Sequence, residues 1–361
     1  MALPSQLSAS PPFLVRVTRL RDDAVVTEPP AAAMMRMITG AWVAQAVYVA
    51  AQLGIADVIA VEGPRSAGDL AERVDADPDA LFRVLRALAG VGVFTERTAG
   101  TFALTPLAES LQSDVPGSLR AFAIMMGGEG VWRSWGEVLH TVRTGEPAFD
   151  HVFGMPLFDH YAANPAAARV GAAGLSARSG GENAAIVAAY DFSTADCVMD
   201  VGGGEGSLLR SILAAHPQLR GVLFEMPHVV DLAREALVGA PGIDRCELVA
   251  GDFFTAIPGR SSLLLLKKVI HDWTDERAAT ILRNCRAALP AGGRLLLVEN
   301  VIPAGNEPSF GKWLDVLMLV YTGGRERTAD EYRDLLATSG FEMTHVVPTA
   351  ASVSVIEALA T

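Results

Sequence analysis

The stretch 198–207, Val-Met-Asp-Val-Gly-Gly-Gly-Glu-Gly-Ser, constrains the fold more than any other part of the chain. The apolar residues that lead into it are typical of a buried parallel strand. Three consecutive glycines follow, and leucine and isoleucine then recur at helical spacing from Leu208 to Leu213. A strand, a glycine turn and a helix in this order place bare backbone N–H groups where a ligand can approach closely.

The spacing of these glycines separates two classes of ligand. A dinucleotide-binding turn has the pattern G-x-G-x-x-G, whereas this chain reads G-x-G-x-G from Gly202 and has Ser207 where the third glycine would stand. Asp200, just before the glycines, favours a cationic ligand over a pyrophosphate. The D-x-G-x-G-x-G spacing resembles motif I of S-adenosylmethionine-dependent methyltransferases. A purely structural turn in another α/β protein is the alternative.

From Cys197 onward, apolar runs alternate with helical patterns. This alternation predicts an α/β domain with a Rossmann-like, doubly wound parallel sheet whose ligands bind at the carboxyl ends of the strands. A short link joins the last two runs and suits a hairpin, so we expect the final strand to be antiparallel. The predicted strands are 197–201, 221–225, 246–250, 262–267, 293–299, 341–347 and 352–358.

Charged residues fall at the ends of successive predicted strands. Glu225 ends the second strand, where a carboxylate can accept both hydroxyls of a ribose. Asp252 and Phe253 end the third, where an acceptor can meet the adenine amine and a ring can stack on the base. Lys267 ends the fourth, within reach of a ligand carboxylate. Any of these residues alone is typical of a surface loop, but together they favour a binding site.

His271 follows the fourth predicted strand directly. A lone histidine in such a loop is most often structural or solvated. Glu299 ends the neighbouring fifth strand, and a carboxylate that accepts the Nδ1 proton makes Nε2 a better base. Glu326 is a second candidate for this orienting role; alternatively it is a carboxylate beside Thr328, which looks like a helix N-cap. The sequence thus predicts a general base with one or two acidic partners.

The first half of the chain reads differently. Residues 1–33 are proline-rich with little periodicity, which indicates a mobile arm. A helix is predicted over 34–51, and 66–104 resembles a winged helix-turn-helix with Ser66 and Asp77 as N-caps. The 66–97 window carries six acidic residues and four arginines, a net charge of −2, so we do not expect it to bind DNA.

Composition limits the function classes further. The net charge of −12 argues against nonspecific nucleic-acid binding. An apolar content of 50% indicates surface buried between subunits. The three cysteines are far apart and form no metal-ligand pattern, so we expect no metal site and a cytoplasmic location. The uncharged stretch 37–56 is long enough to span a membrane, but its alanines and glutamines favour a helix buried in a protein interface, so we expect no membrane partner.

The ordered set of motifs resembles the S-adenosylmethionine-dependent O-methyltransferases of the caffeic acid O-methyltransferase family, in their plant-type and bacterial secondary-metabolite forms. Coverage is about residues 34–360. The matching pieces are Asp200-Val201-Gly202-Gly203-Gly204-Glu205-Gly206, Glu225-Met226-Pro227-His228-Val229, Gly251-Asp252-Phe253-Phe254, Lys267-Lys268-Val269-Ile270-His271-Asp272-Trp273, Glu299-Asn300-Val301-Ile302-Pro303, Gly323-Gly324-Arg325-Glu326-Arg327-Thr328 and, in the helical half, Arg143-Thr144-Gly145-Glu146-Pro147.

This resemblance implies an arm (1–33), a helical, winged-helix-like dimerisation and substrate-lid domain (34–189) and a catalytic domain (190–361) that binds S-adenosylmethionine. It implies a homodimer and a small aromatic acceptor, with His271 as general base bracketed by Glu299 and Glu326. Met318 falls where the family lines the acceptor pocket, and we assign Asp272 and Trp273 to acceptor binding too. The expected cofactor-binding residues are Asp200, Gly202, Gly204, Glu225, Asp252, Phe253 and Lys267.

The chain departs from the family where a Phe-Asn pair and a Met usually precede the glycine motif. It has Gly171 and Gly174 in that region, which indicates a wider acceptor pocket or a mobile wall. The expected function is O-methylation of an aromatic, phenolic or enolic hydroxyl of a natural product. The alternatives are hydroxylation or decarboxylation on the same scaffold, a small-molecule-sensing regulator, which the acidic winged helix disfavours, and a catalytically silent subunit.

Overall fold

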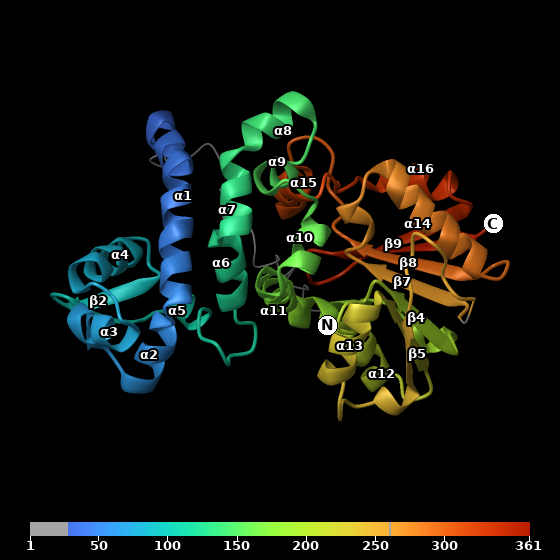
Figure 1. The fold of residues 1–361 in the computed structure, drawn as a ribbon, viewed down its shortest axis with the longest axis horizontal. Helices are drawn as coiled ribbons and strands as arrows, with labels where there is room; N and C mark the ends of the chain where they lie inside the picture. The colour runs from blue at the N-terminus through green and yellow to red at the C-terminus, as the bar shows by residue number, and fades with distance from the viewer. Residues whose placement is uncertain (1–27, 260) are drawn as a thin grey trace, which may run out of the picture. The chain divides into compact units, whose positions relative to one another are not determined.

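The computed structural model describes residues 28–259 and 261–361 (Figure 1). These residues form two compact units. The first contains residues 28–139 and Ala148–Gly180, and the second contains His140–Pro147 and Gly181–Thr361. Most of the arm predicted for residues 1–33 lies outside the described residues.

The first unit is mainly helical, with a small antiparallel sheet in the order β1-β3-β2. The elements before the second unit's sheet, in chain order, are α1 (Pro30–Gln52), α2 (Ile55–Glu62), β1 (Arg65–Ser66), α3 (Ala67–Val74), α4 (Pro78–Gly90), β2 (Phe94–Thr98), β3 (Thr101–Leu104), α5 (Pro106–Glu109), α6 (Arg120–Gly127), α7 (Glu129–Gly136), α8 (Val138–Thr144), α9 (Ala148–Phe153), α10 (Leu157–Ala163) and α11 (Pro165–Ala189).

The predicted N-caps explain where α3 and α4 begin. The Ser66 hydroxyl accepts a hydrogen bond from the Asp69 N–H, and the Asp77 carboxylate accepts one from Ala80. The β2–β3 hairpin follows α4, as the winged pattern predicted. The first helix begins at Pro30, ahead of the predicted Met34, because proline already has helical φ and tolerates a first-turn position without an N–H donor.

α1 and α6 pack together within this unit (Figure 1). A Cβ on Gly127 would lie 2.5 Å from Tyr48 Cγ and still closer to Tyr48 Cβ, so only glycine lets the two helices come this near. In the described part of the chain, no single helix is long and apolar enough to cross a membrane. α1 and α2 pass that test only as a pair, and they are bent by 54° at their junction.

The second unit is built on a seven-stranded sheet in the order β6-β5-β4-β7-β8-β10-β9. Its elements are η1 (Phe192–Thr194), β4 (Cys197–Val201), α12 (Ser207–Ala215), β5 (Arg220–Glu225), α13 (Pro227–Ala236), η2 (Ile243–Arg245), β6 (Cys246–Ala250), β7 (Leu263–Lys267), η3 (Ile270–Asp272), α14 (Asp275–Ala288), β8 (Arg294–Glu299), α15 (Phe310–Tyr321), α16 (Ala329–Ala337), β9 (Phe341–Pro348) and β10 (Ser354–Ala360).

All seven predicted strands are confirmed, with ends that differ by at most two residues. The pairs from β6 through β8 are parallel. β10 pairs antiparallel with both β8 and β9, so the predicted reversal of the final strand is confirmed. The parallel pairing brings the carboxyl ends of β4, β5, β6, β7 and β8 to the same edge of the sheet.

Both faces of the central strands β4, β7 and β8 are buried, which explains their continuous apolar runs. Leu264 and Leu266 of β7 join a cluster with residues of α14 and α16 on one face. Leu263 and Leu265 join a second cluster with residues of α12 and α13 on the other face (Figure 1). Side chains alternate between the faces because successive residues of a strand point in opposite directions.

Candidate active site

The glycine turn between β4 and α12 adopts a backbone that only glycine takes readily. Gly202, Gly204 and Gly206 have φ of 71°, 58° and 75°. The Gly202 N–H donates to the Phe224 carbonyl at 2.9 Å, which fixes the start of the turn against β5. A Cβ on Gly204 would meet nothing within 4 Å. The turn therefore presents open space over bare backbone.

Asp200 at the end of β4 is a buried carboxylate that lies against this turn. Gly203 makes room for it, since a Cβ there would lie 2.5 Å from Asp200 Cγ. Neither carboxylate oxygen has a hydrogen-bonding partner among the described residues. Burial raises the pKa of Asp200 to about 7, although the Lys267 charge acts in the opposite direction. A cationic ligand beside this carboxylate would relieve the cost of burying its charge.

Glu225 ends β5 next to the same turn. Its Oε1 accepts from the Gly204 N–H at 3.2 Å and its Oε2 from the Met226 N–H at 2.6 Å. Burial raises the pKa of Glu225, and these two backbone donors act against the rise. The carboxylate is thus held at the edge of the glycine turn, with lone pairs left for the hydroxyls of a ribose.

Asp252 and Phe253 follow β6. The Asp252 carboxylate accepts from the Phe254 N–H at 2.8 Å and from the Thr255 hydroxyl at 3.0 Å, so it closes a tight turn. The Phe253 ring lies near Gly202, where a Cβ would be 3.4 Å from Phe253 Cε1. The structure thus brings the ring predicted to stack on adenine to the glycine turn.

Lys267 ends β7 and is nearly buried. Its ammonium donates to Asn183 Oδ1 at 2.7 Å and lies 3.4 Å from Glu182 Oε2. Lys268 binds both oxygens of the same Glu182, at 2.7 and 2.8 Å. Burial lowers the pKa of Lys267, and Glu182 partly offsets this effect. The residue predicted to bind a ligand carboxylate therefore already faces one carboxylate of the chain.

The segment after β7 turns sharply and carries His271. Lys268 has a left-handed backbone with φ of 54°, and its N–H donates to the Val298 carbonyl at 3.0 Å. η3 follows at once, so His271 lies beside the end of β8. The His271 carbonyl accepts from the Arg325 N–H at 2.8 Å. This hydrogen bond joins the histidine segment to the segment that carries Glu326.

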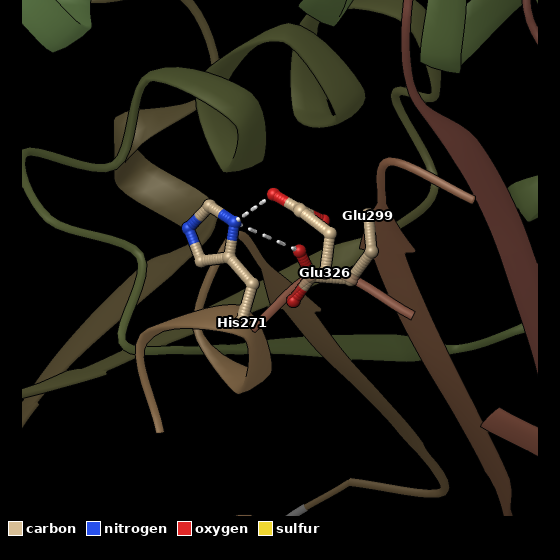
Figure 2. Close-up of side chains that lie close together, drawn as sticks. All are labelled: His271, Glu299 and Glu326. Atoms are coloured by element: carbon tan, nitrogen blue, oxygen red, sulfur yellow. Dashed lines mark hydrogen bonds and ion pairs between the residues drawn. The ribbon is translucent and has the colours of Figure 1, made fainter. Parts of the chain in front are cut away.

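The structure brings His271, Glu299 and Glu326 together from three separate segments (Figure 2). His271 Nδ1 lies 2.7 Å from Glu326 Oε1 and 3.7 Å from Glu299 Oε2. The Glu299 Oε1 accepts from the Ile270 N–H at 3.0 Å. All three side chains are buried, with 6%, 0% and 1% of their residue surface exposed. The imidazole is thus held through Nδ1, and Nε2 is the ring nitrogen that can face a bound substrate.

The carboxylates set the proton affinity of this site. Burial lowers the pKa of His271, but Glu299, Glu326 and Asp272 outweigh it and raise the value from 6.5 to about 10. Burial raises the pKa of Glu299 to about 7 against the opposing effect of His271. The cluster therefore holds a proton strongly, because one imidazole faces several carboxylates in a medium of low polarity.

The three ligand atoms lie within 4.8 Å of one another, so the cluster also has the composition of a cation site. A zinc ion would take nitrogen and oxygen ligands at about 2.0–2.2 Å each. The 2.7 Å separation between Nδ1 and Oε1 is that of a hydrogen bond.

The three residues predicted to meet the acceptor have different surroundings. Asp272 lies beside the base, with Oδ1 3.8 Å from His271 Nε2, and burial raises its pKa to about 6. Met318 is buried on α15. The Trp273 ring packs edge-on against Phe254 at 4.8 Å and beneath the Arg277 guanidinium at 4.5 Å, which fixes its orientation.

The two unusual glycines of α11 leave no open space in their own unit. A Cβ on Gly171 would lie 2.5 Å from the Tyr161 hydroxyl, and one on Gly174 would lie 2.6 Å from Met125 Cβ. Larger side chains already fill both positions. The glycines therefore admit a tyrosine and a methionine to the helix surface instead of widening a pocket at these positions.

Sequence reasoning assigned no role to Arg327, Glu182 or Asn183. Arg327 is 1% exposed and hydrogen-bonds around the histidine segment. Its signal in the sequence was its place next to Glu326 in the Gly-Gly-Arg-Glu-Arg-Thr stretch. Glu182 and Asn183 lie in an alanine- and glycine-rich helix, where no pattern pointed to Lys267.

Comparison with known proteins identifies the family of this chain. The model of the O-methyltransferase domain matches residues 135–342, and that of the O-methyltransferase dimerisation domain matches residues 35–114. The chain is 48% identical over 330 residues to the phenazine O-methyltransferase PhzM of Lysobacter antibioticus, covering 91% of this chain and 96% of that protein. The crystal structure of LaPhzM superposes with a TM-score of 0.88 at 47% identity, over 92% of this chain and 100% of the other.

A relative that methylates nitrogen is similar as well. The phenazine-1-carboxylate N-methyltransferase of Pseudomonas aeruginosa is 31% identical over 314 residues, which cover 87% of this chain and 92% of that protein.

Fold and site together define a class I methyltransferase that uses S-adenosylmethionine. The chain belongs to the O-methyltransferase family and carries that family's dimerisation domain. The residues at the strand ends fit this cofactor. A buried, unpartnered carboxylate at Asp200 suits a cationic ligand, Glu225 offers lone pairs beside the glycine turn, and Gly204 leaves open space above it.

Proposed function

We propose that this protein methylates a hydroxyl oxygen of a small aromatic natural product, with His271 as general base. One observation carries the proposal. The Nδ1 atom of a buried imidazole lies 2.7 Å from Glu326 and 3.7 Å from a second carboxylate, Glu299. Such an arrangement strengthens the basicity of Nε2 and holds the ring in one orientation.

The basicity of His271 suits a phenolic hydroxyl. A phenol has a pKa of about 10, and the carboxylates raise the pKa of His271 to about 10. Once His271 is in its neutral form, proton transfer between the two is close to thermoneutral, whereas an imidazole with the ordinary value would face an uphill step of roughly 5 kcal/mol. Because the protonated imidazole cannot act as a base, we expect turnover to rise with pH towards about 10. General-base assistance of this kind typically contributes ~10²–10⁴-fold to the rate.

The same argument favours oxygen over nitrogen. A hydroxyl must lose its proton as it is methylated, while a ring nitrogen with a lone pair has no proton to remove. A buried base therefore assists the first reaction and has no proton to remove in the second. The chain also resembles an N-methyltransferase, and the two reactions are distinguished by whether the product carries its new methyl group on oxygen or on nitrogen.

S-adenosylmethionine, when bound, supplies an electrophilic methyl group on a positively charged sulfur. We assign its adenosine to Glu225, Asp252 and Phe253, its charged end to Asp200 and Lys267, and its backbone contacts to Gly202 and Gly204. We assign the acceptor to the side chains of Met318, Asp272 and Trp273. Placing acceptor oxygen and methyl group in line accounts for much of the remaining rate enhancement.

We also propose that the protein works as a homodimer. Most of α1, from residue 35 on, lies in the matched dimerisation domain, and this helix exposes Met34, Met37, Ile38 and Trp42 by 57–73% in the single chain. An apolar face of this kind is normally covered by a partner. Light scattering of Trp42→Glu is expected to show monomers, and Val238→Glu, an equally exposed site outside that domain, is expected to stay dimeric.

The proposed activity is tested with radiolabelled S-adenosylmethionine and a panel of phenolic, quinonoid and phenazine acceptors. The position of the new methyl group is read by mass spectrometry and NMR. His271→Ala is expected to lose most of its turnover and keep its affinity for S-adenosylhomocysteine. His345→Ala is the control, because that side chain is 72% exposed. Methylation at nitrogen, or a fully active His271→Ala enzyme, would contradict the proposal.

A further inference from the structure

We infer that Arg327 is a positioning residue for methyl transfer: its guanidinium holds the backbone on both sides of His271 against the segment that carries Glu326. The inference rests on the proposed role of His271 as base. It assigns a function to a side chain that touches none of the reacting atoms.

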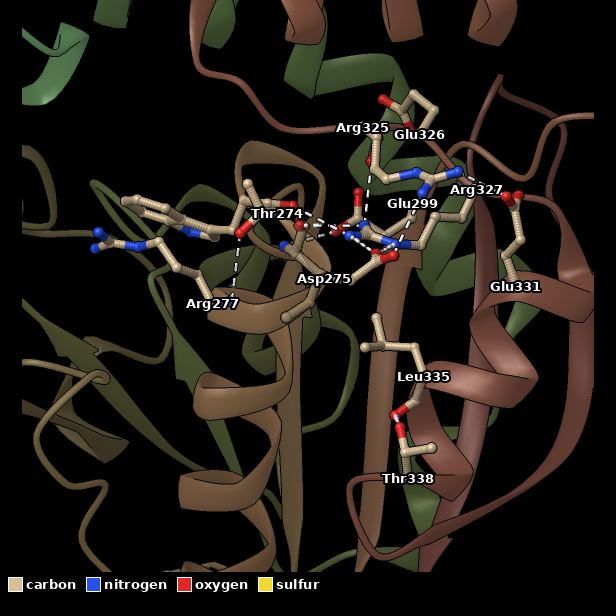
Figure 3. Close-up of polar contacts among 12 residues, drawn as sticks. Thr274, Asp275, Arg277, Glu299, Arg325, Glu326, Arg327, Glu331, Leu335 and Thr338 are labelled. Carbon is tan, nitrogen blue, oxygen red and sulfur yellow. Dashed lines mark hydrogen bonds and ion pairs between the residues drawn. The ribbon is translucent and has the colours of Figure 1, made fainter. Parts of the chain in front are cut away.

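The Arg327 guanidinium uses all five of its N–H donors. Figure 3 shows Arg327 among its polar neighbours, with Asp275 and Arg325 labelled. Nε and Nη2 both donate to Asp275 Oδ1, at 2.9 and 2.7 Å. Nη2 also donates to the Trp273 carbonyl at 3.1 Å. Nη1 donates to the carbonyls of Ile270 at 3.3 Å and Arg325 at 3.1 Å. Because the guanidinium is planar, its five N–H groups point in fixed directions, and each accepting oxygen lies along at least one of them.

Two of these acceptors enclose the base in the sequence. Ile270 precedes His271, and Trp273 follows it two residues later. Because the guanidinium is rigid and 1% exposed, it fixes both carbonyls relative to each other and therefore the path of the backbone between them. The Arg325 carbonyl accepts from the same nitrogen, Arg327 Nη1, as the Ile270 carbonyl. Arg325 belongs to the segment that leads into Glu326.

The backbone of Arg327 reaches the third member of the cluster. Its carbonyl accepts from the Ile302 N–H at 3.1 Å, and Arg327 forms a parallel bridge with Val301, two residues beyond Glu299. One residue thus ties together the segments that carry His271, Glu299 and Glu326. Its positive charge also lowers the pKa of Glu299 against the effect of burial.

Arg325 provides a matched control on the same segment. Its guanidinium also binds Asp275, at 3.3 Å, and Glu331 at 2.7 Å, but its side chain is 45% exposed and contacts neither carbonyl beside His271. Arg325→Ala keeps the backbone N–H that donates to the His271 carbonyl. It therefore removes a neighbouring arginine and an ion pair to Asp275 without touching the proposed positioning contacts.

The test compares Arg327→Lys, Arg327→Met and Arg325→Ala in the full chain. A lysine retains the charge but has three donors at one point, so it cannot hold three carbonyls and a carboxylate at once. We expect Arg327→Lys to lower kcat by about 10²-fold, the loss typical of a 1 Å misplacement. The acceptor KM and the affinity for S-adenosylhomocysteine are expected to change less than about threefold, while Arg325→Ala keeps the wild-type kcat.

Two further readouts separate positioning from general stability. The Nδ1 proton of His271, identified by its absence in His271→Ala, is followed by NMR in the protein without ligand and is expected to shift in both Arg327 variants. In Arg327→Met the loss of the positive charge should also move the pH profile of kcat to higher pH, since the charge lowers the pKa of Glu299. Arg327→Lys should leave the position of that profile unchanged.

Asp275→Asn keeps the test decisive if the Arg327 variants do not fold. Asp275 is 58% exposed at the start of α14, and the change weakens the anchor of Arg327 without creating a buried cavity. We expect kcat to fall about tenfold. A folded Arg327→Lys or Asp275→Asn enzyme with the wild-type kcat and His271 signal overturns the inference. A fully active His271→Ala enzyme instead overturns the proposed function, whatever the Arg327 variants do.

Discussion

Gly324 allows the closest approach of two backbone segments at the site, and Gly324→Ala tests whether that approach sets the rate. A Cβ on Gly324 would lie 2.5 Å from the Asp272 carbonyl carbon, 2.8 Å from Asp272 Cα and nearer still to the His271 carbonyl oxygen. All three are backbone atoms, so no side-chain rotation relieves the clash. The segment with His271 must move away from the segment with Glu326.

The size of this movement follows from the contacts. Real Cβ atoms essentially never come within 3.0 Å of a neighbour, so clearing the His271 oxygen requires a separation on the order of 1 Å. The hydrogen bond from the Arg325 N–H to the His271 carbonyl, 2.8 Å long, is then lost. A misplacement of about 1 Å costs ~10²-fold in rate, which equals roughly 2.7 kcal/mol in the barrier. Overpacking lowers stability by about 1–3 kcal/mol.

The assay measures kcat and S-adenosylhomocysteine affinity for Gly324→Ala beside Gly136→Ala, where an added Cβ meets nothing within 4 Å. We expect kcat to fall about 10²-fold in the first variant and to remain unchanged in the second. Affinity should stay near wild type in both, because the glycine turn and Glu225 lie at the ends of other strands. A folded Gly324→Ala enzyme with wild-type kcat would refute the reasoning.

Three further changes test the electrostatics and the packing. Glu326→Gln removes one of the charges that raise the pKa of His271 to about 10, so the ascending limb of kcat/KM against pH should move to lower pH; an unmoved limb would contradict this. Asp200 has a pKa of about 7 in the folded protein against 3.8, so the folded state keeps a proton that the unfolded state loses, and stability falls as pH rises from about 4 to 7. Asp200→Asn should therefore be more stable than wild type at pH 8 by up to about 4 kcal/mol, with little difference at pH 4, in thermal unfolding of the ligand-free protein. Gly180→Ala meets nothing within 4 Å and should stabilise α11 by roughly 0.5–1 kcal/mol, whereas Gly171→Ala on the same helix meets a tyrosine hydroxyl at 2.5 Å and should lower the melting temperature; equal effects would argue against this packing.

The central strands β4, β5, β7 and β8 were predictable because they are buried on both faces and therefore read as continuous apolar runs. The candidate base and Glu299 were predictable because parallel strands bring their carboxyl ends to one edge, which placed Glu299 beside the segment of His271. Glu326 lies at no strand end, and its signal was the Gly-Gly-Arg-Glu-Arg-Thr stretch. Capping residues such as Ser66 and Asp77 are local signals and could be found without any knowledge of the fold.

The role of Arg327 was not predictable, because the acceptors of its guanidinium include backbone carbonyls more than fifty residues away. Every residue has the same backbone carbonyl, so no pattern of amino acids marks one of them as the partner of an arginine. The side chains that pack against Gly171 and Gly174 could not be predicted for a related reason. A glycine shows that a side chain is absent, but only the fold shows that Tyr161 and Met125 take its place.

The last turns of α11 supply two side chains that compete for Lys267, the residue that we propose binds the charged end of the cofactor. An ammonium has three donors, and that of Lys267 already meets Asn183 and Glu182. Any anion that comes to Lys267 shares it with these two side chains, so its binding free energy includes the change in their contacts. Thermodynamic linkage makes this effect reciprocal. If the bound anion weakens the contact of Glu182 with the two lysines by some factor, then breaking that contact strengthens the binding of the anion by the same factor. Glu182 and Asn183 belong to the last turns of α11, so the way these turns are held enters the affinity of Lys267 for an anion.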